Sequence, residues 1–271
     1  MNLYPIYVIS KGRAKRPLTA RALHRLGIPF SLVIEPQQAE EYKEHVPYAP
    51  QLILPFSNLG QGSIPARNWC WEHALQAGHK RHWILDDNID RFYRLLNNKK
   101  INVLETKENP FIDVERFVDR YTNIALAGLQ YDYFAPRKVK HKPVTFNTRI
   151  YSCILILNEV PIRWRGRYNE DTDLSLRVLK EGWTTALFYL YLAKKISTMT
   201  MRGGNTDELY LQNEKFDGRL EMAKSLQRQH PDVVKIVHKW GRWQHSVDYR
   251  PFKSNALIRV NKKDISYAGN E

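Results

Sequence analysis

The chain of 271 residues has little cysteine, no long apolar run and fewer acidic than basic side chains. Its two cysteines, Cys70 and Cys153, lie in core-like stretches, so we expect reduced, structural thiols and a cytoplasmic protein rather than a disulfide framework. No apolar stretch approaches the roughly 18 residues that a transmembrane helix needs. The first residues lack the charged and apolar blocks of a signal peptide, so we expect no membrane partner.

The shortage of acidic residues is the most informative feature of the composition. Lysine and arginine number 42 against 28 aspartates and glutamates, which gives a formal net charge of +14 and a pI near 9.7. A protein this basic usually binds a polyanion, and nucleic acid fits better than a membrane surface because we find no strongly amphipathic basic helix. Solubility is an alternative explanation for part of the charge. The basic residues are densest at 11–25, 137–142, 163–167 and 235–242.

The first part of the chain has the pattern of a β-α-β unit. Residues 6–10 and 30–34 are apolar runs of strand length, and a helix is predicted between them at 17–26, ended by Gly27. Such units favour parallel pairing, so the basic loop after the first strand should lie at the carboxyl edge of a sheet. Its side chains are candidates for binding a nucleotide phosphate; an ordinary solvated loop is the alternative.

A second strand end carries an acidic cluster. The apolar run that starts at Trp83 ends in Asp86, Asp87 and Asn88. Two adjacent carboxylates repel each other, so a positive partner is expected near them. A divalent cation shared with a substrate diphosphate is one possibility, and an acidic loop or helix cap is the other.

A helix that begins near Pro65, directly after a glycine-rich loop, is predicted to end at Gly78. Arg67 and Asn68 fall in its first turn, and helix N-termini bind phosphate readily. The basic loop, the glycine-rich loop and the acidic cluster should therefore meet at one edge of the sheet.

The second half of the chain continues the alternation of strands and helices. Asn169, Glu170, Asp171 and Asp173 open a helix that Gly182 ends, directly after a basic and aromatic loop. Residues 97–110 are expected to form a loop or hairpin, and Gly203-Gly204 a hinge or an ordinary turn. Other predicted elements are a helix over 114–125, strands at 148–157 and 184–192, and a helix over 217–229.

Taken in order, these stretches resemble the GT-A class of nucleotide-sugar glycosyltransferases. The chain is more closely similar to the TET-associated glycosyltransferase family, which is related to the glycosyltransferase domain of GREB-type proteins. Members are largely encoded by bacteriophages and are linked to sugar transfer onto hydroxymethylated pyrimidines in DNA. The matching stretches are residues 7–13, Ala66-Arg67-Asn68, residues 83–88, Asn169-Glu170-Asp171-Thr172-Asp173 and Trp240-Gly241-Arg242-Trp243-Gln244-His245.

The resemblance implies a single α/β domain of GT-A type with a mixed, mostly parallel sheet and a Rossmann-like N-terminal half. Residues 1–100 would bind the nucleotide-sugar, 101–250 the acceptor, and 251–271 would form a tail. The implied activity is metal-dependent transfer of a sugar, with UDP-sugar as the expected donor and Mn²⁺ or Mg²⁺ as cofactor. Binding of the nucleotide-sugar is assigned to Ser10, Lys11, Arg13, Arg67, Asn68, Asp86 and Arg202.

The resemblance also implies catalytic and metal-binding roles. A carboxylate near the acceptor serves as general base in an inverting transfer, and the family's Glu-Asp motif assigns this to Asp171, with Glu170 beside it. The alternative is that both only cap the helix that they open. Asp87, Asn88 and His245 are the predicted metal ligands, with His238 as a rival to His245.

Duplex DNA carrying hydroxymethylated pyrimidines is the expected acceptor. The aromatic residues of the basic clusters could stack on bases; core packing is the alternative for each of them and the expected state of Trp240. Two other functions are considered: a non-catalytic nucleic-acid-binding protein, and a glycosyltransferase acting on a saccharide or protein. The sequence predicts neither the sugar nor the oligomeric state. The candidate DNA-binding residues are Lys138, Lys140, Arg163, Trp164, Arg165, Arg167, Tyr168, Arg242 and Trp243.

Overall fold

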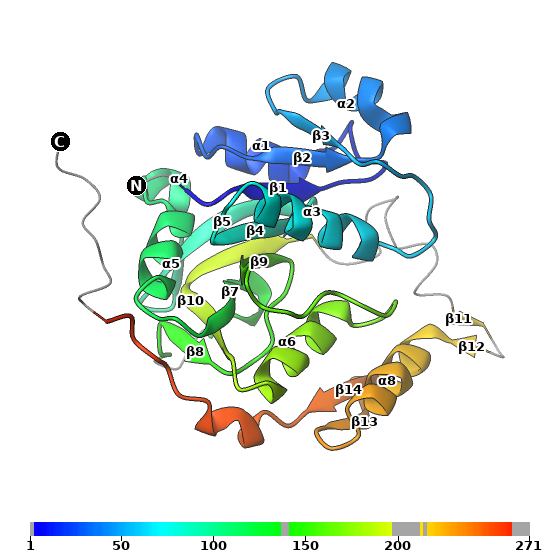
Figure 1. Ribbon diagram of the computed structural model, residues 1–271, viewed down its shortest axis with the longest axis vertical. Helices are drawn as coiled ribbons and strands as arrows, with labels where there is room; N and C mark the ends of the chain where they lie inside the picture. The colour runs from blue at the N-terminus through cyan, green and yellow to red at the C-terminus, as the bar shows by residue number, and fades with distance from the viewer. Residues whose placement is uncertain (1–2, 137–140, 197–211, 214–215, 262–271) are drawn as a thin grey trace.

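The computed structural model describes residues 3–136, 141–196, 212–213 and 216–261. Figure 1 shows a central sheet with helices on both of its faces. The fold is a single α/β domain with a mixed sheet, as predicted from the sequence. No helix in the described part of the chain is long and apolar enough to cross a membrane.

The N-terminal half of the sheet is parallel because helices connect its successive strands. Its elements are β1 (Ile6–Ile9), α1 (Leu18–Arg25), β2 (Ser31–Ile34), η1 (Pro36–Gln38), α2 (Ala39–His45), β3 (Gln51–Ile53), α3 (Ile64–Gln76) and β4 (Arg81–Asp86). β1 pairs in parallel with β2 and β4, and β2 with β3. Alternate side chains enter two cores: Ile6 and Val8 join the core that contains α1 and α2, and Tyr7 joins the core that contains α3.

The second half of the sheet is mostly antiparallel. Its elements are β5 (Ile89–Leu96), β6 (Lys99–Asn102), α4 (Val103–Thr106), α5 (Pro110–Val118), β7 (Ile124–Tyr131), η2 (Asp132–Phe134), β8 (Val144–Phe146), β9 (Cys153–Leu157), α6 (Glu170–Lys180) and β10 (Thr184–Lys195). The strand order is β3-β2-β1-β4-β9-β7-β10-β5-β6, and β8 pairs with β10. Because Leu85 of β4 lies opposite Cys153 of β9, the residue before β9, Ser152, comes to lie beside Asp86.

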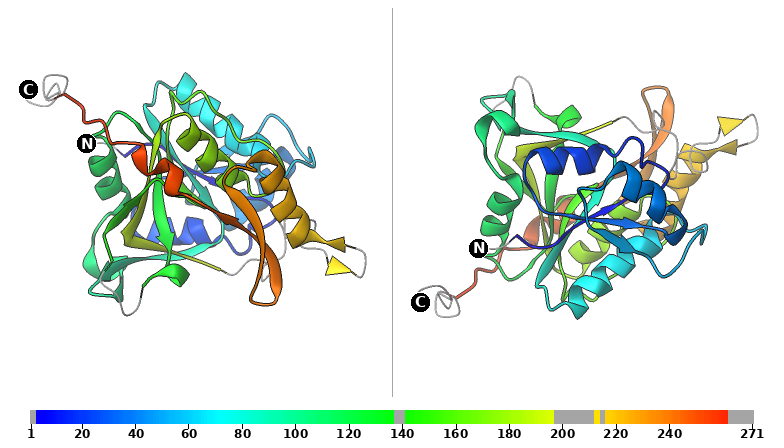
Figure 2. Two further views of the ribbon diagram at one scale, coloured as in Figure 1. Left: turned by 90° about the horizontal axis from the view of Figure 1, so that it is seen from below. Right: turned by 90° about the horizontal axis from the view of Figure 1, so that it is seen from above.

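The last part of the described chain packs on α6. Its elements are β11 (Gln212–Asn213), β12 (Phe216–Asp217), α8 (Gly218–Gln229), β13 (Val234–Lys239), β14 (Arg242–Val247) and η3 (Arg250–Ser254). Asp217 caps α8, since its carboxylate accepts hydrogen bonds from the backbone N–H groups of Arg219 and Leu220. A third core joins Leu176 and Leu179 of α6 to this segment. Figure 2 shows that the β13–β14 hairpin extends beyond the rest of the fold.

One predicted helix was wrong in its extent, and one strand was missed. The helix predicted over 114–125 ends at Val118, and residues from Ile124 onward form the buried strand β7. Alanine and isoleucine fit either pattern in a short window, and the sheet decides between them. Strand β5 was missed because Asp90, Arg91 and Arg94 interrupt its apolar run.

Candidate active site

Asp86, the last residue of β4, binds groups from three other elements. Its Oδ1 accepts a hydrogen bond of 2.9 Å from Nη2 of Arg67, at the start of α3. Its Oδ2 accepts from Oγ of Ser152 at 2.6 Å and from Nζ of Lys195, at the end of β10, at 2.8 Å. Burial raises the pKa of Asp86, but the charges of Lys195 and Arg67 lower it by more. Asp86 therefore stays ionised.

The next residue, Asp87, points to the other side of the turn. It accepts a hydrogen bond of 2.7 Å from Oγ of Ser10 and forms an ion pair with Arg13, both in or next to the loop after β1. Burial raises the pKa of Asp87 although Arg13 opposes this effect. The convergence of the β1 loop and the acidic cluster that the sequence predicted is present, and it involves Asp87 rather than Asp86.

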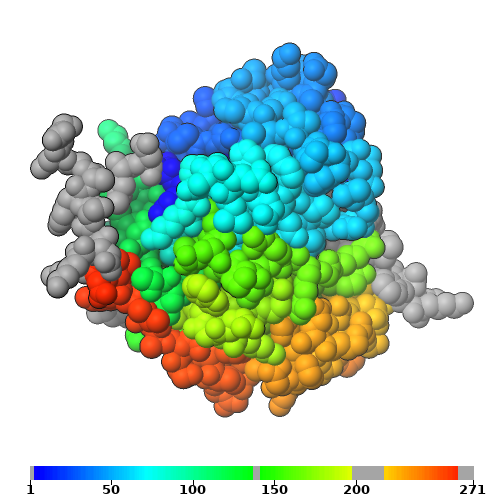
Figure 3. Space-filling view, viewed as in Figure 1, coloured from blue at the N-terminus to red at the C-terminus, as the bar shows by residue number. Residues whose placement is uncertain are grey.

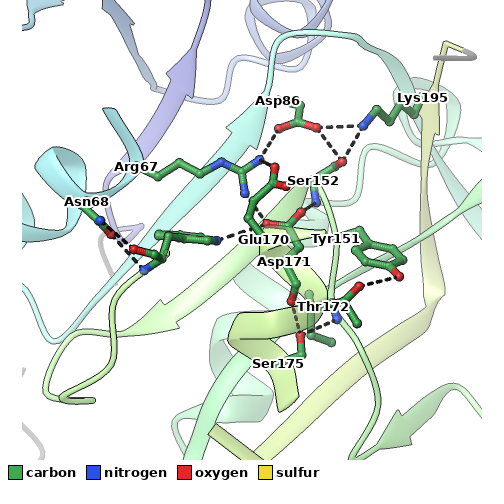
Figure 4. Close-up of polar contacts among 12 residues, drawn as sticks. Arg67, Asn68, Asp86, Tyr151, Ser152, Glu170, Asp171, Thr172, Ser175 and Lys195 are labelled. Carbon is green, nitrogen blue, oxygen red and sulfur yellow. Dashed lines mark hydrogen bonds and ion pairs between the residues drawn. The ribbon is translucent and has the colours of Figure 1, made fainter. Parts of the chain in front are cut away.

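Arg67 joins Asp86 to the start of α6, as Figure 4 shows. Its side chain is only 4% exposed and forms ion pairs with Asp86 and Asp171, with Glu170 at 3.9 Å. Burial lowers the pKa of this guanidinium, but the charges of Asp171, Asp86 and Glu170 raise it by more. A permanent positive charge is thus held between three carboxylates at the carboxyl edge of the sheet.

The two acidic residues that open α6 have different surroundings. Asp171 receives three donors: Arg67, the indole Nε1 of Trp164 at 3.2 Å, and the backbone N–H of Ser152 at 3.3 Å. Asp171 therefore links three segments. The alternative, in which it only caps α6, does not account for these contacts. Glu170 has a side chain 21% exposed, and burial raises its pKa although Arg67 opposes this effect. Glu170 is the less constrained carboxylate of the pair.

Sequence reasoning missed Lys195 and the hydroxyl groups around it. Nζ of Lys195 also donates to Oγ of Ser152 at 2.8 Å and lies 5.6 Å from the ring centroid of Tyr131. The Tyr131 hydroxyl is 2.6 Å from Oγ of Ser152, and its ring stacks on that of Tyr151. The lysine pair at the end of the apolar run 184–192 could have suggested a cation at this edge of the sheet.

Asn68 and Trp164, predicted to bind donor and DNA, contact each other. Nδ2 of Asn68 donates to the backbone oxygen of Trp164 at 2.9 Å, and Oδ1 of Asn68 accepts from its N–H at 3.0 Å. Trp164 is 2% exposed, so its indole is not available to stack on a base. These two residues fix the loop before α6 and hold the Nε1 donor against Asp171.

The other residues of the basic loop differ in exposure. Arg163 pairs with Glu72 at 2.7 Å, and Arg165 pairs with the buried Asp173 at 3.1 Å. Arg167 is exposed and Tyr168 is partly exposed, so both agree with a surface role. Lys11, in the loop after β1, pairs with Glu35 at 2.9 Å.

The remaining predictions lie on β14 or outside the described residues. Arg242 is exposed, Trp243 is 39% exposed, and Trp240, expected in the core, is 83% exposed at the hairpin tip. The expectation of core packing for Trp240 was therefore wrong, because Trp240 lies in the exposed two-residue turn between β13 and β14. Arg202, Lys138, Lys140 and Gly203-Gly204 lie outside the described residues.

The predicted metal ligands do not form one cluster. Within the described ranges, no group of three or more histidine, cysteine, aspartate or glutamate side chains is arranged to hold a metal ion. His245 lies on β14, where burial and the charge of Arg149 lower its pKa to about 4. Asn88 differs: its Oδ1 is buried and has no hydrogen-bond partner in the described structure. An unpaired amide oxygen two residues from a carboxylate fits a hard cation such as Mg²⁺ or Mn²⁺.

A model of the family described as TET-Associated Glycosyltransferase matches residues 4–204. No curated protein matches the chain. Among solved structures, a protein of Desulfovibrio desulfuricans G20, assigned as a nucleotide-diphospho-sugar transferase, is similar with 12% identity and a TM-score of 0.36 over 67% of this chain and 77% of that one. GalNAc-T7, solved with UDP, GalNAc and Mn²⁺, is similar with 12% identity and a TM-score of 0.37 over 72% of this chain and 44% of its own.

Proposed function

The chain belongs to the TET-associated glycosyltransferase family, and on that premise we propose that it moves a sugar from a UDP-sugar onto hydroxymethylated pyrimidines in duplex DNA. The observation that carries the proposal is the cluster of Asp86, Glu170 and Asp171 around one buried guanidinium at the carboxyl edge of the sheet. Open α/β sheets bind their ligands at this edge. A net charge of +14 supports a polyanionic acceptor.

The donor would lie between the β1 loop and the end of β4. Asp87 binds Ser10 and Arg13 in this region and so fixes the loop after β1 against the end of β4. The buried Arg67 and the partly exposed Lys195 supply two positive charges next to Asp86. Charge builds on the diphosphate as its bond to the sugar breaks, and fixed cations in a buried site stabilise that charge.

We assign the general base to Glu170 and a positioning role to Asp171. The acceptor hydroxyl attacks the anomeric carbon, the bond from that carbon to the diphosphate breaks, and the hydroxyl proton passes to a carboxylate. Asp171 already accepts from three donors, whereas Glu170 contacts Arg67 only at 3.9 Å and is partly exposed. The raised pKa of Glu170 also makes it a stronger base than an ordinary glutamate.

Asn88 is the residue that would give an oxygen ligand to a divalent cation, with Asp86 two residues before it in the chain. The argument is the unpaired, buried Oδ1 of Asn88 together with the oxygen chemistry of the pair. When bound, the cation would act as a Lewis acid on the leaving diphosphate. His245 then becomes less suitable as a ligand than the sequence suggested, since the described residues do not bring it into a cluster with Asp86 and Asp87.

Mass spectrometry of nucleosides tests this function directly. DNA with hydroxymethylcytosine is incubated with the protein and a panel of UDP-sugars, and a new glycosylated nucleoside is expected with wild type but not with Glu170→Gln. Unmodified DNA is the matched control, since it lacks the acceptor hydroxyl. Transfer to an oligosaccharide or a protein but to no DNA would refute the proposed acceptor. DNA binding without any transfer would favour a non-catalytic role.

A further inference from the structure

The β13–β14 hairpin has an unusual tip. Lys239 lies opposite Arg242, so the turn consists of Trp240 and Gly241 alone. Both have positive φ, +54° and +69°. Two-residue hairpin turns with two positive φ angles strongly prefer Asn-Gly, and a bulky residue in the first position is strained. Folding alone therefore does not explain a tryptophan at this position.

The exposure of this tryptophan adds to the anomaly. Trp240 is 83% exposed, and the side of the hairpin behind it carries Trp243, which is 39% exposed and lies edge-on to His238 with ring centroids 4.9 Å apart. Backbone strain that persists at an exposed position points to a function outside the folding of the chain. The indole of Trp240 is flat, apolar and exposed, so it is suited to stack between flat groups of a binding partner.

The charge of the hairpin indicates the partner. Over 234–247 the hairpin carries Lys235, Lys239 and Arg242 and has no aspartate or glutamate. Lys239 and Arg242 flank Trp240 directly on the two strands. A ring at the tip with a cation on each strand behind it matches nucleic acid, where aromatic side chains stack on bases and basic side chains bind the backbone.

Helix α8, on which both strands of the hairpin pack, is fixed to the helix that carries the proposed base. Nε2 of His230, at the end of α8, is 2.9 Å from Oδ1 of Asp173 in the first turn of α6. Nδ2 of Asn169, the residue before Glu170, donates to the backbone oxygen of Met222 in α8 at 2.8 Å. In Figure 3 the segment that contains α8 and the hairpin lies directly against the segment that contains α6. The base of the hairpin and Glu170 thus lie on two helices that are held together.

We propose that Trp240 inserts into the base stack of duplex DNA and occupies the space left when the target pyrimidine is extruded. Lys239 and Arg242 bind the phosphates on either side of it. The inference rests on the proposed function, because an enzyme that modifies a base inside a duplex must first take it out of the stack. Six-residue strands span about 20 Å, which is enough to reach through a groove about 8 Å deep.

Trp240→Asn separates insertion from folding. Asn-Gly is the preferred sequence for this turn, so the variant should melt at or above the wild-type temperature. On fully paired DNA we expect its kcat/KM to fall about 10–100-fold, in line with the loss of one stacked ring. On single-stranded DNA, where no base has to be extruded from a duplex, we expect activity within about twofold of wild type. Trp240→Phe should restore most of the activity on paired DNA.

A fluorescence assay measures extrusion without transfer. 2-Aminopurine takes the place of the target base in a duplex; it should brighten when wild type binds and extrudes it, and stay quenched when Trp240→Asn binds at saturation. Arg242→Gln is the matched control: it should weaken binding to both DNA forms alike and reduce the salt slope by about one. The insertion role would be overturned if wild type and Trp240→Asn had the same ratio of activity on paired to single-stranded DNA and gave the same fluorescence. Failure of wild type to glycosylate any DNA would instead refute the proposed function.

Discussion

Replacement of Arg67 by methionine tests whether one buried cation holds the site together. The Arg67 side chain is 4% exposed and is paired with Asp86 and Asp171. Removing one partner of a buried ion pair costs about 3–5 kcal/mol, because the other charges stay buried without compensation. In a chain of this size each kcal/mol lowers the melting temperature by about 2 °C, so we expect a loss of about 6–10 °C at pH 7.

The loss should depend on pH in a defined direction. The pKa of Asp86 is lowered in the folded protein, so its contribution to the free energy of unfolding is present above the unfolded pKa, about 4, and disappears as pH falls through the folded pKa. Without Arg67 the pKa of Asp86 rises, and protonation relieves the unpaired charge at higher pH. The difference in melting temperature between wild type and Arg67→Met should therefore shrink as the pH is lowered from 7 to 4.

Calorimetric melting at pH 7 and pH 4 measures both effects. Arg165→Met is the matched control, since Arg165 also pairs with a buried carboxylate but is 51% exposed, while Arg177 and His230 continue to contact Asp173. We expect that control to lose less than about 1 kcal/mol. An Arg67→Met variant that melts with the control at pH 7, or whose loss in melting temperature is as large at pH 4 as at pH 7, would refute the reasoning.

Three further predictions follow from the site. Glu170→Gln should lower kcat about 10²–10⁴-fold at unchanged melting temperature. Asp171→Asn should also lower the melting temperature, because Arg67 loses a partner. If Asp171→Asn lowered kcat at unchanged melting temperature and Glu170→Gln lowered the melting temperature, Asp171 would be the base. Wild-type kcat/KM should fall on the acidic side through a pKa above that of an ordinary glutamate, because the base must be ionised and its pKa is raised. Asn88→Asp should tighten and Asn88→Leu should weaken Mn²⁺ binding in calorimetric titration; identical affinities would exclude Asn88 as a ligand.

Most helices and strands were predictable because their apolar residues repeat with the period of the element. The runs that became β1, β2 and β4 are continuous and short, and the helix ended by Gly27 shows one apolar face. Arg67, Asp86 and the start of α6 were named as candidate site residues because each lies at the end of a predicted strand or in the first turn of a predicted helix. The local sequence pattern indicates such positions. The partly polar strand β5 and the helix–strand boundary near Ile124 lack such marks, and only pairing within the sheet decided them.

The sequence by itself determined that basic and acidic side chains would meet at the carboxyl edge of a parallel sheet. Only the tertiary structure decided which charge meets which: Asp86 pairs with Arg67 and Lys195, which are 19 and 109 residues away, while Asp87 turns to Arg13. Trp164 and Trp240 both follow a basic residue in a basic stretch, yet one is buried against Asp171 and the other is exposed. Burial depends on the segments that pack around a residue, and residues distant in the chain supply those segments.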